Sequence, residues 1–284
     1  MFERFSRSWS LVRASASVLA KDKELLVFPL ISSAALLLVL AGFALPVIGL
    51  GGLDGISGRQ EDLPPMAYVV AFLFYFCQYF VIFFFNAALV GAVMIRLDGG
   101  DPTVKDGLRI ASSKVAVIAG YAFIAATVGM LLRVIQERVG FIGKIVVSLI
   151  GFGWTLATYL VVPVLVHRDV GPWEAVRESA ALLRETWGEN VIGRAGIGLA
   201  FGIIFFFVMV AGGFVIIVAL MSGSAWLIAL AFLATILALG VTALVQAALG
   251  GIYAAALYRY AADGSGSLGF EPETLKLAFG PAKK

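Results

Sequence analysis

The sequence contains one cysteine, one histidine and few charged residues, and these shortages exclude several classes of protein. Cys77, inside an apolar run, cannot form a disulfide framework or a cysteine metal cluster. His167 alone cannot make a zinc site of the usual multi-histidine type. Charged residues are only 14% of the 284 residues, far below the share of an ordinary soluble domain. We therefore exclude a water-soluble protein and expect no metal or other cofactor.

Apolar residues are abundant instead, at 61% of the chain, and they are concentrated in long runs. Six runs contain enough residues for the roughly 20 that an α-helix needs to cross a bilayer. They lie near residues 25–50, 66–95, 115–132, 144–166, 195–220 and 225–258. The first run is too long for a secretory signal, so we interpret it as a retained span. The sequence predicts an all-α polytopic membrane protein with six transmembrane helices.

Lysine and arginine are distributed unequally between the segments that connect these runs. Seventeen of the 21 precede the first run, separate the second from the third or the fourth from the fifth, or follow the sixth. Cytoplasmic loops carry the excess of Lys and Arg, so this distribution predicts a multi-pass protein of the cell (inner) membrane with both termini cytoplasmic. The net charge of +3 is too small for nucleic-acid binding, and membrane lipid is the expected partner.

The segment "GPWEAVRESAALLRETWGEN", residues 171–190, is a charged island between two apolar runs. Its apolar residues recur at helical spacings of three and four, which predicts an amphipathic cytoplasmic helix. The residues of this apolar face are Trp173, Val176, Ala180, Leu183 and Trp187. We hypothesise that the face contacts neighbouring helices, the membrane interface or a protein partner.

Two other segments resemble this island, and each also precedes a pair of apolar runs. The sequences "VRASAS", "LRIASS" and "VRESAA", which begin at Val12, Leu108 and Val176, all read aliphatic residue, arginine, any residue, then three small residues. The order of one amphipathic helix and two spans predicts three pseudo-repeats. The expected units are a single membrane domain at 1–262, with repeats at about 1–97, 98–168 and 169–262, and a cytoplasmic C-terminal tail at 263–284.

The stretch "EAVRESAALLRETWGEN" and its place before a span resemble families of uncharacterised six-span prokaryotic membrane proteins. The chain is more distantly similar to the membrane domain attached to some glycerophosphodiester phosphodiesterases, but it lacks their soluble phosphodiesterase domain. The resemblance implies a type of fold and no activity.

Three amides within the apolar runs are the candidate polar residues of the membrane interior: Gln78, Asn86 and Gln246. In a low-dielectric setting they must find partners, either each other across helices or a ligand on a polar permeation or lipid-access path. Pro163 leaves the carbonyl of Tyr159 without its helical donor, which predicts a kink that is either static or a candidate hinge.

Small residues on the last two runs predict close contacts between helices. They are Ala243, Ala247, Gly251 and Ala255 at every fourth position of the sixth run, and Gly198 with Gly202 on the fifth.

The sequence contains no P-loop and no dinucleotide-binding glycine pattern, so we expect the protein not to be an enzyme. Our first hypothesis is a non-enzymatic scaffold or accessory subunit that acts with a protein partner or as a homo-oligomer. The alternative is a channel or permease for a small or lipid-like molecule, motivated by the repeats and by the three amides.

Overall fold

The computed structural model describes residues 13–49, 65–186 and 191–263, and every regular element in these ranges is a helix. This confirms the all-α prediction for the described ranges. Residues 13–21 are helical and lead into a short 3-10 helix. The elements that follow are η1 (Lys23–Leu26), α2 (Val27–Gly49), α4 (Pro65–Leu97), α5 (Val104–Ser113), α6 (Val115–Arg138), α7 (Phe141–Ala157), α8 (Val161–His167), α9 (Pro172–Thr186), α10 (Val191–Met221) and α11 (Ala225–Asp263).

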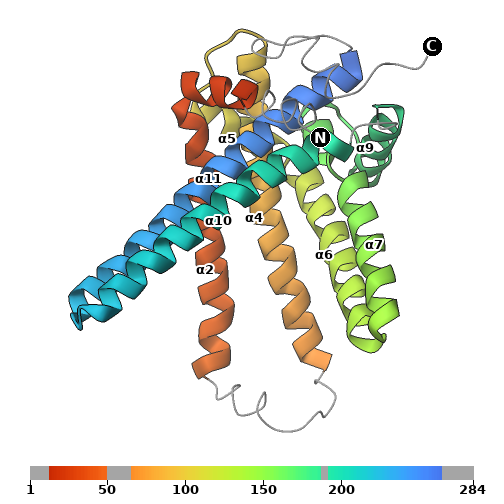
Figure 1. Ribbon diagram of the computed structural model, residues 1–284. Coiled ribbons are helices and arrows are strands. Elements are labelled where there is room, and N and C mark those ends of the chain that lie inside the picture. The colour runs from red at the N-terminus through yellow and green to blue at the C-terminus, as the bar shows by residue number, and fades with distance from the viewer. Residues whose placement is uncertain (1–12, 50–64, 187–190, 264–284) are drawn as a thin grey trace.

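Six helical segments of the described chain are long and apolar enough to cross a membrane, as the six runs predicted. They are Lys23–Pro46, Met66–Leu97, Val115–Arg138, Phe141–His167, Phe201–Met221 and Ala225–Ala262. α7 and α8 together make the fourth. α11 has 39 residues, about 58 Å of helix at 1.5 Å per residue, which exceeds the ~30 Å hydrocarbon layer. In Figure 1 this helix runs obliquely to α2 and α4, which accommodates its extra length.

α4 is the central helix of the bundle, packing against α2, α5, α6, α8 and α11. α10 packs along α11 as an antiparallel hairpin that turns at Gly223, whose φ of 66° is in the left-handed region that favours glycine. Towards this turn the hairpin diverges from α2 and α4 (Figure 1). The helices are therefore close together at one end of the bundle and separate at the other.

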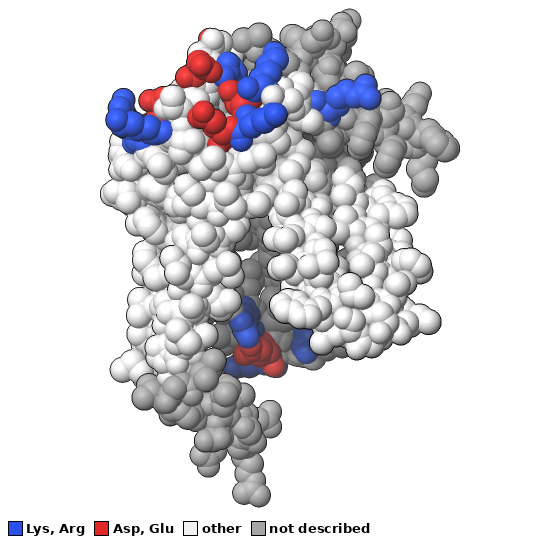
Figure 2. Space-filling view, turned by 90° about the vertical axis from the view of Figure 1, so that its left-hand side faces the viewer, with Lys and Arg blue, Asp and Glu red and all other residues white. Residues whose placement is uncertain are grey.

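The packed end also carries α5, α9 and most of the charged side chains, and we call it the charged end (Figure 2). Fully buried side chains gather there from the last turns of α4, from α8 and from the C-terminal part of α11. Leu160, Ile252 and Tyr258 are examples, with at most 1% of their surface exposed. The apolar core of the protein is thus a layer beneath the charged surface.

α5 lies on this layer because its sequence makes both an N-terminal cap and an apolar face. The Thr103 hydroxyl accepts a hydrogen bond from the Asp106 N–H (3.2 Å), and the Asp106 carboxylate accepts one from the Thr103 N–H (3.1 Å). This capping box satisfies backbone donors that a helix start leaves unpaired. The hydrogen bonds from Thr103 also hold the pKa of Asp106 below its usual value.

In the three segments with the shared signature, the equivalent position of the signature is buried in the protein interior. The first of the three small residues is Ser15, Ala111 or Ser179, and each is 0% exposed. The arginine two positions earlier is exposed in every copy. The Ser17 and Ser113 hydroxyls, at equivalent positions, donate to the carbonyl oxygens of the residues three before them. The signature therefore marks an equivalent buried contact, while the repeat boundaries stay a prediction.

Ion pairs connect the helices at the charged end. The Arg96 guanidinium, at the end of α4, donates to the carboxylates of Asp22 and Asp101. Arg259 near the end of α11 pairs with Asp98 at 2.7 Å between Nη1 and Oδ1. The segment just before α2 and the C-terminal turns of α11 are therefore both connected to the end of α4.

A second group of ion pairs joins α6, α8 and α9. Lys114 Nζ pairs with the Asp169 carboxylate and donates to the carbonyl of Arg168 at 3.1 Å. Arg168 Nε lies 2.9 Å from Glu178 Oε1 on α9 and 3.3 Å from the Tyr258 hydroxyl. The hydrogen bond and charge of Lys114 hold the pKa of Asp169 below its usual value.

The small residues of the last two helices divide into a packed set and an unpacked set. A Cβ added at Gly251 would lie 2.5 Å from Leu89 Cδ2, so α11 approaches α4 closely there, and Ala255 is fully buried. Gly198 and Gly202 would meet no atom within 4 Å. The predicted close contact at these two glycines is therefore not found among the described residues.

Candidate intramembrane binding site

A cavity of about 860 Å³ lies where α4, α6, α7 and α11 meet beneath the charged end. Its size falls within the range of small-molecule binding sites. The wall residues come from α2 (Pro29, Ser32), α4 (Tyr79, Ile82, Phe83, Phe85, Asn86, Leu89), α6 (Tyr121, Ala125, Gly129, Leu132), α7 to α8 (Gly151, Trp154, Thr155, Thr158, Tyr159, Val162), α10 (Gly198) and α11 (Ala243, Gln246, Ala247, Gly250, Gly251, Ala254).

Two of the three predicted amides belong to this wall. Asn86 on α4 and Gln246 on α11 both line the cavity. Gln78 is not among the described wall residues, although it lies two turns before Asn86 on the same side of α4, about 12 Å away along the axis. The structure thus brings together Asn86 and Gln246 in one cavity and leaves Gln78 closer to the far end of α4.

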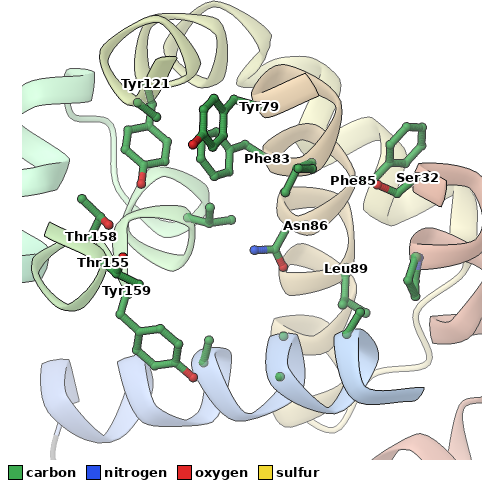
Figure 3. Close-up of a pocket in the computed structure, with 18 of the residues that line it drawn as sticks. Ser32, Tyr79, Phe83, Phe85, Asn86, Leu89, Tyr121, Thr155, Thr158 and Tyr159 are labelled. Atoms are coloured by element: carbon green, nitrogen blue, oxygen red, sulfur yellow. The ribbon is translucent and has the colours of Figure 1, made fainter. Parts of the chain in front are cut away.

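The Asn86 amide projects from α4 into the cavity, towards the side where Thr158 and Tyr159 lie (Figure 3). Its Oδ1 is 3.4 Å from the position that a Cβ on Gly251 would occupy. Small residues of α11 on this side keep the space in front of the amide open. Gly250, for example, lines the cavity, and its added Cβ would meet no atom within 4 Å.

An aromatic row forms another part of the wall. Phe83 stacks on Tyr121 with 4.4 Å between ring centroids and on Tyr79 with 5.6 Å. The Tyr121 phenol is directed at the Thr158 hydroxyl (Figure 3). This side of the cavity therefore offers flat apolar ring faces with a few hydroxyl groups between them.

Hydroxyl groups from α7 complete the polar lining. Thr155 donates to the carbonyl of Gly151 at 2.9 Å, and Thr158 donates to that of Trp154 at 2.8 Å. Because each hydroxyl hydrogen is directed to its own helix, these two oxygens can serve other groups only as acceptors. The sequence analysis missed these threonines and the wall tyrosines. The cluster "TLATY", residues 155–159, just before the predicted kink was the available signal.

The wall contains a break in the fourth span, near the predicted kink. α7 ends at Ala157 and α8 begins at Val161, so Pro163 lies in the first turn of α8, where an N–H has no acceptor within the helix. The break thus precedes Pro163, and Tyr159 lies in the turn between the two helices. The Leu160 N–H donates to the buried Ser179 hydroxyl of α9 at 3.0 Å. The helix is interrupted here, and the hydrogen bond to α9 supports this interruption. Whether Pro163 acts as a hinge stays a prediction.

The two amides lie deep in the membrane part of the protein. Asn86 precedes Arg96 by ten residues on α4, and Gln246 precedes Arg259 by 13 on α11. At 1.5 Å per residue these separations are about 15 Å and 20 Å along the helices. With the ion pairs of the charged end at the membrane surface, Asn86 would lie about 15 Å into a ~30 Å hydrocarbon layer, and Gln246 on the oblique α11 less than 20 Å into it.

The cavity lies at the narrow end of a crevice between the α2–α4 pair and the α10–α11 hairpin. Figure 2 shows this crevice between two uncharged columns of the molecule. α2 and α10 expose apolar side chains, such as Leu38 (75%) and Phe207 (64%). The described wall of the cavity includes residues of α2, α4, α10 and α11, so the cavity borders this crevice.

Within the described ranges, no cluster of three or more His, Cys, Asp or Glu side chains could hold a metal ion. The chemistry available at the cavity is that of carboxamides, hydroxyls and aromatic rings. Such groups bind and orient a ligand through hydrogen bonds and ring contacts.

The predicted face of α9 is partly turned inward. Val176 and Leu183 are buried, at 6% and 5% exposed, and Ala180 is partly buried. Trp173 is 54% exposed, and Trp187 lies outside the described residues. The part of the hypothesis that concerns neighbouring helices applies to Val176 and Leu183, and an interfacial or partner contact of Trp173 stays a prediction.

The comparison with protein families matches residues 65–269, which is α4 to the end of α11 and slightly beyond. The chain belongs to DUF6159, a family of unknown function. No curated protein matches the chain. The six apolar helices and the family membership agree with the six-span membrane protein that the sequence resembled. The comparisons provide no link to glycerophosphodiester phosphodiesterases.

Proposed function

We propose that this DUF6159 protein binds a lipid-like molecule in the cavity and exchanges it sideways with the bilayer. The observation that supports the proposal is the 860 Å³ cavity, which lies beside an apolar crevice and has Asn86 and Gln246 in its wall. A concave site with mostly apolar walls and a few convergent polar groups is the usual form of a ligand site. The cavity favours the lipid-like permease among the hypotheses drawn from the sequence.

The crevice favours a ligand with an apolar tail. A polar head held by the amides inside the cavity would leave its tail between α2–α4 and α10–α11, where apolar side chains are exposed. That tail would stay in an apolar environment throughout binding, so no large desolvation cost opposes exchange with the bilayer. A water-soluble solute would gain nothing from this lateral opening.

The proposed location is the cell (inner) membrane, with the charged end in the cytoplasm. The described Lys and Arg residues at the opposite end are Arg133, Arg138 and Lys144, whereas the charged end has many more. This agrees with the positive-inside rule. Single cysteines in a Cys77→Ser background test it: a membrane-impermeant thiol reagent should label Lys144→Cys and not Arg109→Cys in intact cells. The reverse pattern would contradict the orientation.

A scaffold or accessory role is the second candidate, and the exposed part of α9 favours it. Trp173 is a large aromatic side chain that is 54% exposed beside exposed Glu174. A partner that co-purifies in stoichiometric amount with the wild type and is lost in Trp173→Ser would support this role. A partner retained by Trp173→Ser would argue against this surface.

Binding of a fluorescent lipid analogue to the protein in proteoliposomes tests the main proposal. We expect Asn86→Leu with Gln246→Leu to weaken binding about tenfold, or about 1.4 kcal/mol, because the cavity loses its carboxamides. Gln78→Leu is the matched control, since it removes an amide of α4 away from the described cavity wall. Binding unchanged in the folded double variant, or weakened equally in both variants, would contradict the proposal.

A further inference from the structure

We infer that the cavity selects lipids whose head group is uncharged and forms hydrogen bonds, such as a hydroxyl or carbonyl head of the diacylglycerol type. This inference rests on the proposed function and adds the chemical class of the ligand. It depends on the depth of the polar wall groups, on the kind of groups they are, and on the aromatic wall beside them.

Depth is the first argument. Asn86 lies about 15 Å along α4 from Arg96, so a head group bound to its amide sits near the bilayer centre. A phosphate at that depth would have to leave the aqueous interface, which costs several kcal/mol unless a cation compensates for it. A diacylglycerol head carries no charge, so its transfer to the same depth costs far less.

The chemistry of the wall is the second argument. Asn86 and Gln246 each present an N–H₂ donor and a carbonyl acceptor at the cavity wall. An ester carbonyl accepts from the amide N–H groups, and a free hydroxyl donates to an amide carbonyl oxygen. The described wall thus complements a head that contains both groups.

The aromatic wall is the third argument, and it also provides a probe. Tyr79, Phe83 and Tyr121 form a stacked row that accommodates the glycerol and the first chain methylenes by dispersion contact. Trp154 lies in the same wall. Its indole fluorescence therefore reports on any quencher that occupies the cavity.

The experiment uses the full-length protein with Trp154 as the single tryptophan, the other four being changed to phenylalanine, in phosphatidylcholine vesicles. Two probes with identical dibrominated acyl chains are compared at equal mole fraction: diacylglycerol and phosphatidic acid, which differ only by the phosphate. Bromine quenches at short range. We expect diacylglycerol to quench Trp154 at least threefold more than phosphatidic acid.

Two variants separate the cavity from general lipid contact. Gly250→Leu places a side chain in the open space of the cavity, and Gly240→Leu places one on the same helix away from the described wall; neither added Cβ meets an atom within 4 Å. We expect Gly250→Leu to reduce the diacylglycerol quenching to the phosphatidic acid level and Gly240→Leu to leave it unchanged.

The outcomes distinguish this inference from the proposed function. Quenching by phosphatidic acid that equals or exceeds that by diacylglycerol, and that Gly250→Leu removes, would overturn the uncharged-head inference while supporting a lipid site. Quenching by either probe that is insensitive to Gly250→Leu would overturn both. A diacylglycerol preference that Asn86→Leu with Gln246→Leu abolishes would support the inference and assign the selectivity to the carboxamides.

Discussion

α11 presents two different faces over the same stretch of helix. Ala248, Ile252 and Ala255 share one face, are 0% exposed and belong to the packed core together with residues of α4 and α8. Ala247 and Gly250 lie on another face of the helix and line the cavity. A Cβ added at Gly250 would meet no atom within 4 Å. Small residues therefore make a close contact on one face of α11 and a cavity wall on the other.

The largest expected effect comes from breaking the ion pairs of the charged end. Arg96→Leu leaves the Asp22 carboxylate, whose side chain is 10% exposed, without its cation. We expect a loss of about 3 kcal/mol in the free energy of unfolding, because a buried charge without a partner is strongly destabilising. Unfolding of the purified protein in mild detergent measures it.

Two comparisons sharpen that prediction. Arg133→Gln removes an ion pair with Glu137 whose members are both 63% exposed, and we expect a change below about 1 kcal/mol. Asp22→Leu combined with Arg96→Leu should recover part of the lost stability, since it removes both charges. Equal losses of stability in Arg96→Leu and Arg133→Gln would contradict the prediction that the buried ion pair of the charged end contributes more than the exposed pair at the opposite end.

The second largest loss of stability is expected where α5 packs closely against α4. A Cβ at Gly107 would lie 2.5 Å from the Ala88 carbonyl oxygen and 2.5 Å from Phe28 Cζ. Gly107→Ala should therefore destabilise the protein by about 2 kcal/mol through overpacking against backbone. Gly153→Ala, where nothing lies within 4 Å, is the control and should be neutral or stabilising. Thermal unfolding compares them, and a stable Gly107→Ala would refute the tight contact.

A smaller effect is expected at the break between α7 and α8. Ser179→Ala leaves the buried Leu160 N–H without its acceptor, so we expect a loss of about 1 to 2 kcal/mol. Ser113→Ala removes an exposed hydroxyl that bonds only within α5, and it should change stability by less than about 0.5 kcal/mol. If Ser179→Ala proved as harmless as its control in the same unfolding assay, α9 would not support the break.

The smallest expected effect is on the pH dependence of stability. Lys114 lowers the folded-state pKa of Asp169, so this pair contributes stability above the unfolded pKa of about 3.9 and loses it as the pH falls through the lower folded value. Asp169→Asn should reduce the loss of stability below about pH 5, only slightly because the side chain is exposed. Unfolding between pH 7 and pH 3 measures this, and a steeper loss in Asp169→Asn would contradict the sign.

The sequence was sufficient to predict the six spans, because apolar runs and the charges between them are local properties. Runs near 66–95 and 225–258 became α4 (Pro65–Leu97) and α11 (Ala225–Asp263). An irregularity of the fourth span near Pro163 was also predictable, since proline lacks a donor, and the structure has an interruption between Ala157 and Val161. Asn86 and Gln246 were found as candidates because an amide in an apolar run is unusual.

The cavity itself was not predictable from the sequence. It exists because particular faces of α4, α6, α7 and α11 meet around open space, whereas the small residues Gly198 and Gly202 had favoured a close helix contact. Tyr121 and Thr158 were overlooked because hydroxyl residues in spans are common and usually bond to their own helix. Whether they line a cavity depends on which helices face each other, and the spacing of residues along one helix does not show this.

The most direct test of the lipid site is a structure determined with native lipids retained. We expect density for a bound molecule between Asn86 and Gln246, with its tail in the crevice beside α10 and α11 and its head within hydrogen-bonding distance of both carboxamides. A structure in which α10 and α11 close onto α2 and α4, so that the two amides bond to each other and no cavity remains, would contradict it.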